Sequence, residues 1–193
     1  MKKITFVTSN KGKVVSAQKY FEGTDIELEI YDHDLIEPRT DNITEIAESK
    51  VRQAYEIVKR PCIAQDSGFF IEELNGFPRA FVNFALDTIG IEGILKLMKD
   101  VDNRSCKFKE CLAYYDGEKI EYFYAEQPGK LSDSIKGEDT AEKWSPLWYI
   151  FIGDYSLEGK TNTELSKEEM DEIYKRRTSS FIEFANWYKE NKI

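Results

Sequence analysis

A short polar loop near the start of the chain has the composition of a phosphate-binding site. It covers residues 8–13 (TSNKGK), follows the apolar run 4–7 and precedes a helical pattern. A helix N-terminus carries partial positive charge and N–H groups without intrahelical partners, which suits phosphate oxygens, and the two lysines add to that field. The alternative, which composition favours equally, is a polar residue that only caps the helix beside solvated lysines. The candidate phosphate ligands are Thr8, Ser9, Asn10 and Lys13.

Two carboxylates at predicted strand ends form a candidate metal site. Glu37 follows residues 34–36 (DLI), and Asp66 follows residues 63–65 (IAQ). Hard cations such as Mg²⁺ take one or two carboxylates together with phosphate oxygens of a substrate. The Ser-Gly pair after Asp66 predicts a tight turn at the end of a strand, where active-site loops are common. A single carboxylate is more often a helix cap or a surface charge, so the predicted metal site depends on the pair.

The elements that would position these residues are strands and helices in alternation. Apolar or alternating runs predict strands at residues 4–7, 26–31, 62–64, 108–115, 120–124 and 148–152. Helical spacing of apolar residues predicts helices at 14–21, 43–58, 91–99, 166–177 and 179–189. Gly12 is predicted to form a turn, and Asp116-Gly117 the tip of a hairpin. We expect an α/β fold in a single domain over residues 1–193, with a mixed central sheet, flanking helices and two lobes around a nucleotide cleft.

Composition limits the partners. Twenty-seven basic and thirty-six acidic residues give a formal charge of −9, which disfavours binding to DNA or RNA. No apolar run approaches the roughly 20 residues of a membrane span, and no signal peptide is recognisable, so we expect a cytoplasmic protein with no membrane partner. Cys62, Cys106 and Cys111 lack zinc-site spacing and are interpreted as reduced core thiols. His33 is the only histidine, and no nucleophile motif accompanies it.

The order of these motifs resembles the inosine triphosphate pyrophosphatase family, whose members split deaminated purine nucleoside triphosphates into monophosphate and pyrophosphate. Residues 6–13 fit the family's T-x-N-x-x-K phosphate loop, and residues 35–37 fit the segment with its metal-binding glutamate. Residues 63–68 and 74–78 fit its A-D-D-S-G and L-x-G-x-P stretch, and residues 161–165 fit its T-x-A-E-L. Four ordered matches over most of the chain make the resemblance specific.

The resemblance implies Mg²⁺-dependent hydrolysis of a nucleoside triphosphate, with Mn²⁺ as a further candidate metal. The loop of residues 8–13 would hold the phosphates, and Glu37 and Asp66 would bind the metal. Asp66 and Lys13 would be the catalytic residues, with Asp66 orienting or deprotonating the attacking water. Gln65 departs from the family, which usually has an acidic residue there, and Asn83 stands where a basic residue is expected.

The base-recognition end fits less well. The family's G-F-G-(Y/W)-D-P stretch corresponds to residues 143–149 (KWSPLWY), without its glycines or its aspartate, and the family's lysine corresponds to Met170. Its S-H-R triplet becomes residues 174–176 or 175–177, depending on register, and lacks the histidine either way. Trp144 and Trp148 can stack on a base, or can equally be core aromatics. The identity of the base is therefore open. The candidate base-binding residues are Ser67, Trp148, Lys175, Arg176 and Arg177.

Three functions follow from these observations. The first is hydrolysis of a nucleoside triphosphate, with a deaminated or modified purine as a candidate base, to monophosphate and pyrophosphate. The second is a nucleotide-binding sensor, or degenerate relative, with little turnover, as Gln65 and the altered base end suggest. The third is hydrolysis of another phosphorylated metabolite, which would release orthophosphate. In each case the partner is a small phosphorylated molecule, and the resemblance implies a homodimer.

Overall fold

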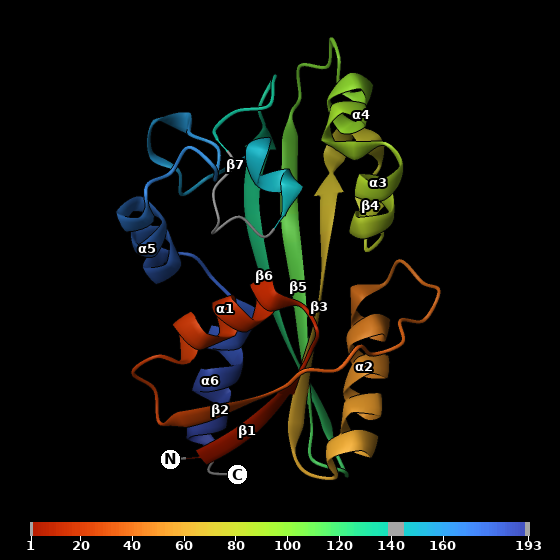
Figure 1. Cartoon of the computed structure of the whole chain (residues 1–193), viewed down its shortest axis with the longest axis vertical. Helices are drawn as coiled ribbons and strands as arrows, with labels where there is room; N and C mark the ends of the chain where they lie inside the picture. The colour runs from red at the N-terminus through yellow and green to blue at the C-terminus, as the bar shows by residue number, and fades with distance from the viewer. Residues whose placement is uncertain (1, 139–144, 192–193) are drawn as a thin grey trace. The chain divides into compact units, whose positions relative to one another are not determined.

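The computed structural model describes residues 2–138 and 145–191, and its chain divides into two compact units (Figure 1). The first unit contains the residues up to Ser67, Glu110–Ala125 and the residues from Thr178 onward. The second unit contains Gly68–Lys109 and Glu126–Arg177. The single domain expected over residues 1–193 and its nucleotide cleft stay predictions.

The first unit is built on parallel strands covered by helices on both faces. β1 pairs in parallel with β2 and with β3, and the register places Val7 opposite Tyr31 and Phe6 opposite Ile63. The helices α1 and α6 pack together on one face, and α2 lies against the other (Figure 1). The elements are β1 (Lys2–Val7), α1 (Lys11–Phe21), β2 (Ile26–Tyr31), α2 (Ile43–Val58), β3 (Cys62–Ile71), β5 (Ser105–Tyr115), β6 (Ile120–Leu131) and α6 (Ser180–Glu190).

Aromatic side chains from α6 form the centre of the first core. The Phe181 ring packs edge-on against Phe6 and Phe21, with centroids 5.5 and 5.7 Å apart, and Phe184 lies edge-on to Phe123 at 5.5 Å. Phe181 and Phe184 are almost completely buried. Because edge-to-face ring pairs add to the burial of a large apolar area, this cluster fixes α6 against the sheet and α1.

The second unit has its own core around Phe69, Phe151 and Met98, all buried. Phe69 and Phe151 pack edge-on with their centroids 6.0 Å apart. Besides the remaining parts of β3, β5 and β6, the unit contains β4 (Pro78–Arg79), α3 (Val82–Thr88), α4 (Gly90–Leu97), β7 (Phe151–Gly153), α5 (Lys167–Arg176) and the short 3₁₀ helices Glu72–Leu74, Pro146–Tyr149 and Leu157–Gly159.

The strands of the described residues form a mixed sheet in the order β2-β1-β3-β5-β6-β7, with β4 paired to β3. β3 and β4 run antiparallel, as do β6 and β7. The predicted mixed sheet with flanking helices is confirmed. Within residues 2–138 and 145–191, no helix combines the length and the apolar character that crossing a membrane requires.

Three local predictions were wrong. Gly12 is not a turn but the second residue of α1, because the Asn10 side chain caps the helix and starts it at Lys11. The predicted turn after Asp66 is continuous strand, since β3 runs on to Ile71. The predicted strand 148–152 was wrong over its first part, because residues 146–149 form a 3₁₀ turn with Pro146 in its first position, which the fixed φ of proline favours, and β7 begins only at Phe151.

Candidate active site

The loop between β1 and α1 is held by its own side chains. The Thr8 N–H donates to the Tyr31 carbonyl at 3.1 Å, and the Thr8 hydroxyl accepts from the Asn10 N–H at 3.1 Å. The Asn10 side chain accepts from the Lys13 N–H at 3.0 Å and so caps α1. Asn10 therefore caps the helix, as the alternative interpretation of this loop predicted. The N–H groups of Lys11 and Gly12 still have no acceptor within α1, because the first N–H groups of any helix lack intrahelical partners. The loop presents two amides beside the Lys13 side chain, an arrangement that suits an anion.

Lys13 carries its ammonium group into a confined position. Its Nζ donates to the Gln65 carbonyl at 2.8 Å and lies 3.9 Å from Asp66 Oδ1, and only 14% of the side chain is exposed. Burial lowers the pKa of Lys13 from 10.5 to about 8; the charge of Lys50 acts in the same direction, and nearby carboxylates, chiefly that of Asp66, oppose it. An ammonium poorly solvated by water is well placed to gain from an incoming phosphate.

Lys50 of α2 completes a charge cluster around the buried Asp66 that the sequence did not predict. Its Nζ donates to Asp66 Oδ1 at 3.1 Å and to Glu37 Oε1. Burial lowers its pKa, but Asp66 and Glu37 outweigh that effect and the pKa of Lys50 is raised. The signal was present: Lys50 lies on the stripe of α2 that otherwise carries apolar residues such as Ile46 and Val51. A lysine in such a stripe needs carboxylate partners to compensate for the loss of water around its ammonium group.

Asp66 stands at the centre of this cluster, with 7% of its side chain exposed. Burial raises its pKa even though both ammonium groups favour the carboxylate form. A carboxylate that keeps a raised pKa beside two cations can accept a proton from water more readily than an exposed aspartate. The two predicted metal ligands are thus brought together by one lysine, whose Nζ contacts both Glu37 and Asp66.

The donor set fits a hard divalent cation that binds together with phosphate. Glu37 and Asp66 offer carboxylate oxygens, and 56% of the Glu37 side chain is exposed, so it can turn towards a ligand. Within the part of the chain that the structure describes, no group of three or more His, Cys, Asp and Glu side chains is placed to hold a metal. Mg²⁺ commonly relies on one or two carboxylates and completes its shell with water and phosphate oxygens, which suits this pair.

The remaining residues of the predicted phosphate site lie close by in the first unit. Ser9 donates to Asp34 Oδ1 at 3.2 Å and is exposed. Ser67, a candidate for the base, lies in β3 directly after Asp66 and is half-buried. The first unit therefore contains every candidate phosphate and metal ligand and one of the candidate base ligands.

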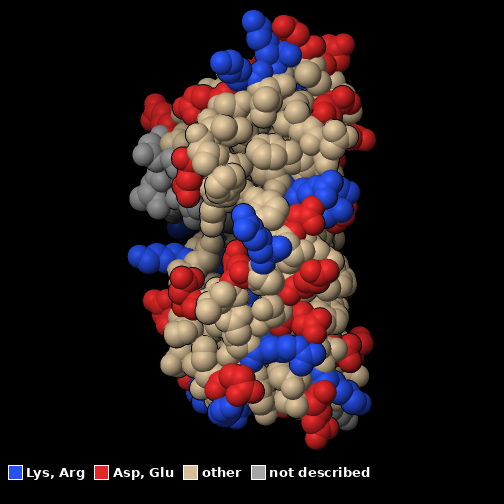
Figure 2. Space-filling model, turned by 90° about the vertical axis from the view of Figure 1, so that its right-hand side faces the viewer, with Lys and Arg blue, Asp and Glu red and all other residues tan. Residues whose placement is uncertain are grey.

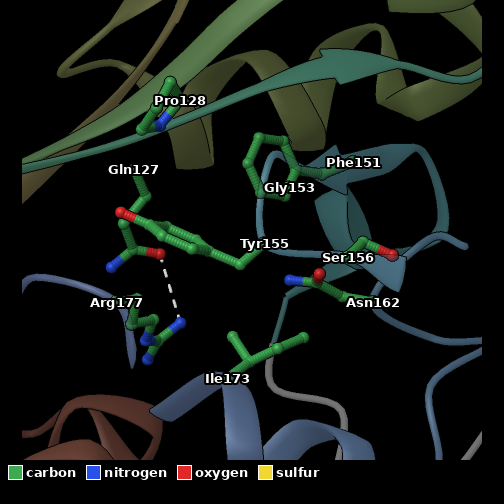
Figure 3. A pocket seen from close by; sticks show the side chains of 9 residues that line it. All are labelled: Gln127, Pro128, Phe151, Gly153, Tyr155, Ser156, Asn162, Ile173 and Arg177. Carbon is green, nitrogen blue, oxygen red and sulfur yellow. Dashed lines mark hydrogen bonds between the residues drawn. The ribbon is translucent and has the colours of Figure 1, made fainter. Parts of the chain in front are cut away.

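The other candidate base residues belong to the second unit and differ in exposure. Lys175 and Arg176 are exposed and pair with Glu172, whereas Arg177 is buried. The Arg177 guanidinium donates to Gln127 Oε1 at 3.1 Å and lies 3.9 Å from the centre of the Tyr174 ring. Figure 3 shows Arg177 and Gln127 joined at the edge of a small pocket that Tyr155, Phe151 and Asn162 also line. This pocket, of about 20 Å³, has room for about one water and not for a purine.

The other base candidates are tryptophans. Trp148 is buried, and its carbonyl accepts from the Thr163 hydroxyl at 3.3 Å, so the core-aromatic alternative describes its position. Trp144 lies outside the described residues. The matched segment 161–165 is a turn in which Glu164 Oε2 accepts from both the N–H and the hydroxyl of Thr161 at 2.9 Å. That bonding lowers the pKa of Glu164 and gives the motif a structural role.

Comparison with known proteins finds relatives that match almost the whole chain. A family model described as the Ham1 family matches residues 4–187. The dITP/XTP pyrophosphatase of Thermococcus kodakarensis is 37% identical over 191 residues, covering 98% of each chain. That of Methanopyrus kandleri is 37% identical over 190 residues, covering 98% of this chain and 97% of the relative. The structure of a HAM1 protein from Coxiella burnetii superposes with a TM-score of 0.80 at 20% identity, covering 98% of this chain and all of the other.

Proposed function

The chain belongs to the Ham1 family, and from that premise we propose that it hydrolyses non-canonical purine nucleoside triphosphates of the dITP and XTP class to monophosphate and pyrophosphate. The observation that carries the proposal is the cluster of Lys13, Lys50, Glu37 and Asp66 beside the capped start of α1. Two buried cations and two carboxylates can bind a polyphosphate and a divalent metal together. Neither a dinucleotide motif nor a P-loop motif accompanies them in the sequence.

We assign the phosphate tail to the loop of residues 8–13. The amides at the start of α1, the Thr8 and Ser9 hydroxyls and the Lys13 ammonium would contact phosphate oxygens, and Lys50 would add a second positive charge. Phosphoryl transfer depends mainly on positioning and charge neutralisation, which buried ammonium groups supply without solvent reorganisation. For Asn10 we propose an indirect role, because its side chain caps α1 and keeps the loop amides aligned.

Glu37 and Asp66 would hold Mg²⁺, or Mn²⁺ in its place. The bound cation would neutralise phosphate charge and make water more acidic. Asp66 would then orient the water that attacks the α-phosphorus and accept its proton, while the bond to the bridging oxygen breaks and pyrophosphate leaves. Burial raises the pKa of Asp66 above that of an exposed aspartate, which makes its carboxylate the stronger base of the two.

For the base we propose a role for Arg177 ahead of Lys175 and Arg176. Arg177 is buried and its guanidinium is held by Gln127 and the Tyr174 ring, so a planar donor group is already fixed in place, whereas the other two are exposed on α5. The pocket that Arg177 lines is too small for a purine, so the base would bind outside it. Ser67 and Trp148 stay candidate base contacts. Since the residues of this region depart from the family pattern, the preferred base has to be measured rather than transferred from the relatives.

Pyrophosphate release tests the proposed function. A panel with dITP, XTP, ITP and the four common triphosphates, assayed with Mg²⁺ or Mn²⁺, should yield pyrophosphate most rapidly from the non-canonical purines. Asp66→Asn should lower the rate by about a hundredfold or more, because a general base contributes about 10²–10⁴-fold. Exposed Asp102 offers a matched control, and Asp102→Asn should leave the rate unchanged. Orthophosphate as the product, no turnover with either metal, or an unchanged rate in Asp66→Asn would refute the proposal.

We also propose that a second copy of the chain covers an apolar patch on the second unit. Phe77, Phe81, Phe84 and Ile89 are 37, 44, 69 and 40% exposed around β4 and α3, and Figure 2 shows the face that carries α3 and α4. Exposed rings in a cluster are typical of an interface, and a stable one buries about 800 Å² per partner. Phe84→Glu should shift the light-scattering mass from dimer to monomer, whereas Val15→Glu on α1 should not.

For the location we propose the cytoplasm, which the three buried free thiols support.

A further inference from the structure

A carboxylate on β5 lies next to the reaction centre without belonging to it. Glu110 Oε2 accepts from the Ser179 hydroxyl at 3.2 Å, from the Ser180 N–H at 3.1 Å and from the Ser180 hydroxyl at 3.0 Å. All three donors are at the start of α6, where a negative charge is favourable. The same oxygen lies 3.4 Å from the Gln65 side-chain nitrogen. Glu110 therefore connects the first residues of α6 to β3.

The hydrogen bonds have one consistent direction. The Gln65 amide donates to the Ser180 hydroxyl at 2.8 Å, and that hydroxyl in turn donates to Glu110. Gln65 and Ser180 are buried, at 6% and 0% exposed, so these bonds are shielded from water. Shielded, charge-assisted bonds of this kind hold their partners firmly.

This direction explains why residue 65 is an amide. A carboxylate at residue 65 would meet Glu110 across one hydroxyl, and a single hydroxyl proton cannot satisfy two anionic acceptors. The two like charges would also repel each other in a buried setting. An amide at residue 65 supplies the donors that Glu110 needs. The negative charge thus stands on β5 instead of β3.

Gln65 is also part of the site's framework. Its carbonyl accepts from Lys13 Nζ at 2.8 Å, and the next residue is Asp66. A shift of Gln65 would therefore move one anchor of Lys13 and change the direction of the Asp66 side chain. Displacements of about 1 Å can cost a hundredfold in rate when charge positioning is the main source of catalysis.

We propose that Glu110 is a positioning residue of the pyrophosphatase reaction, paired with Gln65 so that this carboxylate–amide pair fixes the β3 backbone, which carries Asp66 and whose Gln65 carbonyl anchors the Lys13 ammonium. The inference rests on the proposed function but concerns residues that touch neither substrate nor metal in that proposal. It predicts that the pair works in either orientation. A carboxylate on β3 facing an amide on β5 should serve as well as the native arrangement, whereas two amides or two carboxylates should not.

The test is an exchange of the two side chains. Glu110→Gln and Gln65→Glu alone should each lower kcat/KM by about tenfold or more, and the double variant Q65E/E110Q should recover it to within about threefold of the native value. Ser180→Ala removes the hydroxyl between the two side chains and keeps the Ser180 N–H, so it should lower kcat/KM as well. Glu121→Gln, at an exposed position on the neighbouring strand β6, is the matched control and should have no effect.

The thermal midpoint of each variant separates positioning from stability. Single variants that lose stability but keep kcat/KM, or a double variant that regains its thermal midpoint but not its kcat/KM, would overturn the positioning role. Absence of pyrophosphate release by the native chain would instead defeat the proposed function. In that case calorimetry would measure how tightly the same variants bind inorganic tripolyphosphate. Weaker binding in each single variant and recovered binding in the double variant would support the positioning role, and any other pattern would overturn it.

Discussion

The protonation of Lys13 should set the alkaline limit of the enzyme. Burial lowers the pKa of this ammonium group to about 8, so the free enzyme loses a phosphate-binding charge as the pH rises through that value. A lysine binds phosphate only when protonated, and kcat/KM reports the protonation state of the free enzyme. The expected profile is therefore level near pH 7 and falls above about pH 8.

The size of the fall follows from the pKa. With a pKa of about 8, the protonated fraction of Lys13 drops about tenfold between pH 7 and pH 9, and kcat/KM should drop in proportion. Bound triphosphate brings negative charge next to the ammonium and raises its pKa, so the fall in kcat should begin at higher pH than the fall in kcat/KM. On raising the pH, kcat/KM should therefore fall first and kcat second.

Initial rates of pyrophosphate release across pH 6–9.5 measure both profiles. Lys13→Arg is the control, because a guanidinium stays charged throughout this range, and its kcat/KM should lack the alkaline fall whatever its absolute value. A native profile that stays level to pH 9.5, or the same fall in Lys13→Arg, would refute the assignment to Lys13. So would a kcat profile that falls before that of kcat/KM.

Two further predictions concern the core. Phe184→Ala should lower the free energy of unfolding by about 3–5 kcal/mol, because Phe184 is fully buried among aromatic rings. Urea unfolding followed by tryptophan fluorescence would measure the change, and a loss below about 1 kcal/mol would contradict the packing described. Burial raises the pKa of the Cys62 thiol to about 12, so iodoacetamide at pH 8 should not alkylate Cys62 in the native protein. Once urea unfolds the protein, Cys62 should be alkylated, and mass spectrometry would detect the difference. Rapid alkylation of the native protein would contradict its burial.

The sequence predicts much of the first unit because its signals are local. The run 4–7 and the pattern after it give β1 and α1, and the predicted helices 43–58 and 179–189 match α2 and α6 to within one residue at each end. Gly68 was wrongly predicted to lie in a turn, because glycine occurs both in turns and at strand positions where another backbone approaches closely, and residue type alone does not distinguish the two. Here it lies beside β4, where an added Cβ would come within 2.7 Å of the Arg79 carbonyl oxygen.

The site was predicted only in part because some of its contacts join distant segments. Thr8, Asn10 and Lys13 are neighbours in the chain, and their shared loop shows in the sequence. Lys50 of α2 contacts Asp66 of β3, and Glu110 of β5 contacts Ser180 of α6, which is 70 positions away in the sequence. Pairings of this kind depend on which strands are adjacent, which composition and spacing do not encode.

The route of the chain has a consequence for synthesis. The chain passes between the two units four times, and α6 is made after every other described element. Phe181, Phe184 and Tyr188 of that helix belong to the core that backs β1 and α1. On the ribosome, the phosphate loop is therefore made well before the helix whose aromatic side chains support it. A nascent chain that ends before Ser179 should be a target for chaperones and proteases rather than a nucleotide-binding protein.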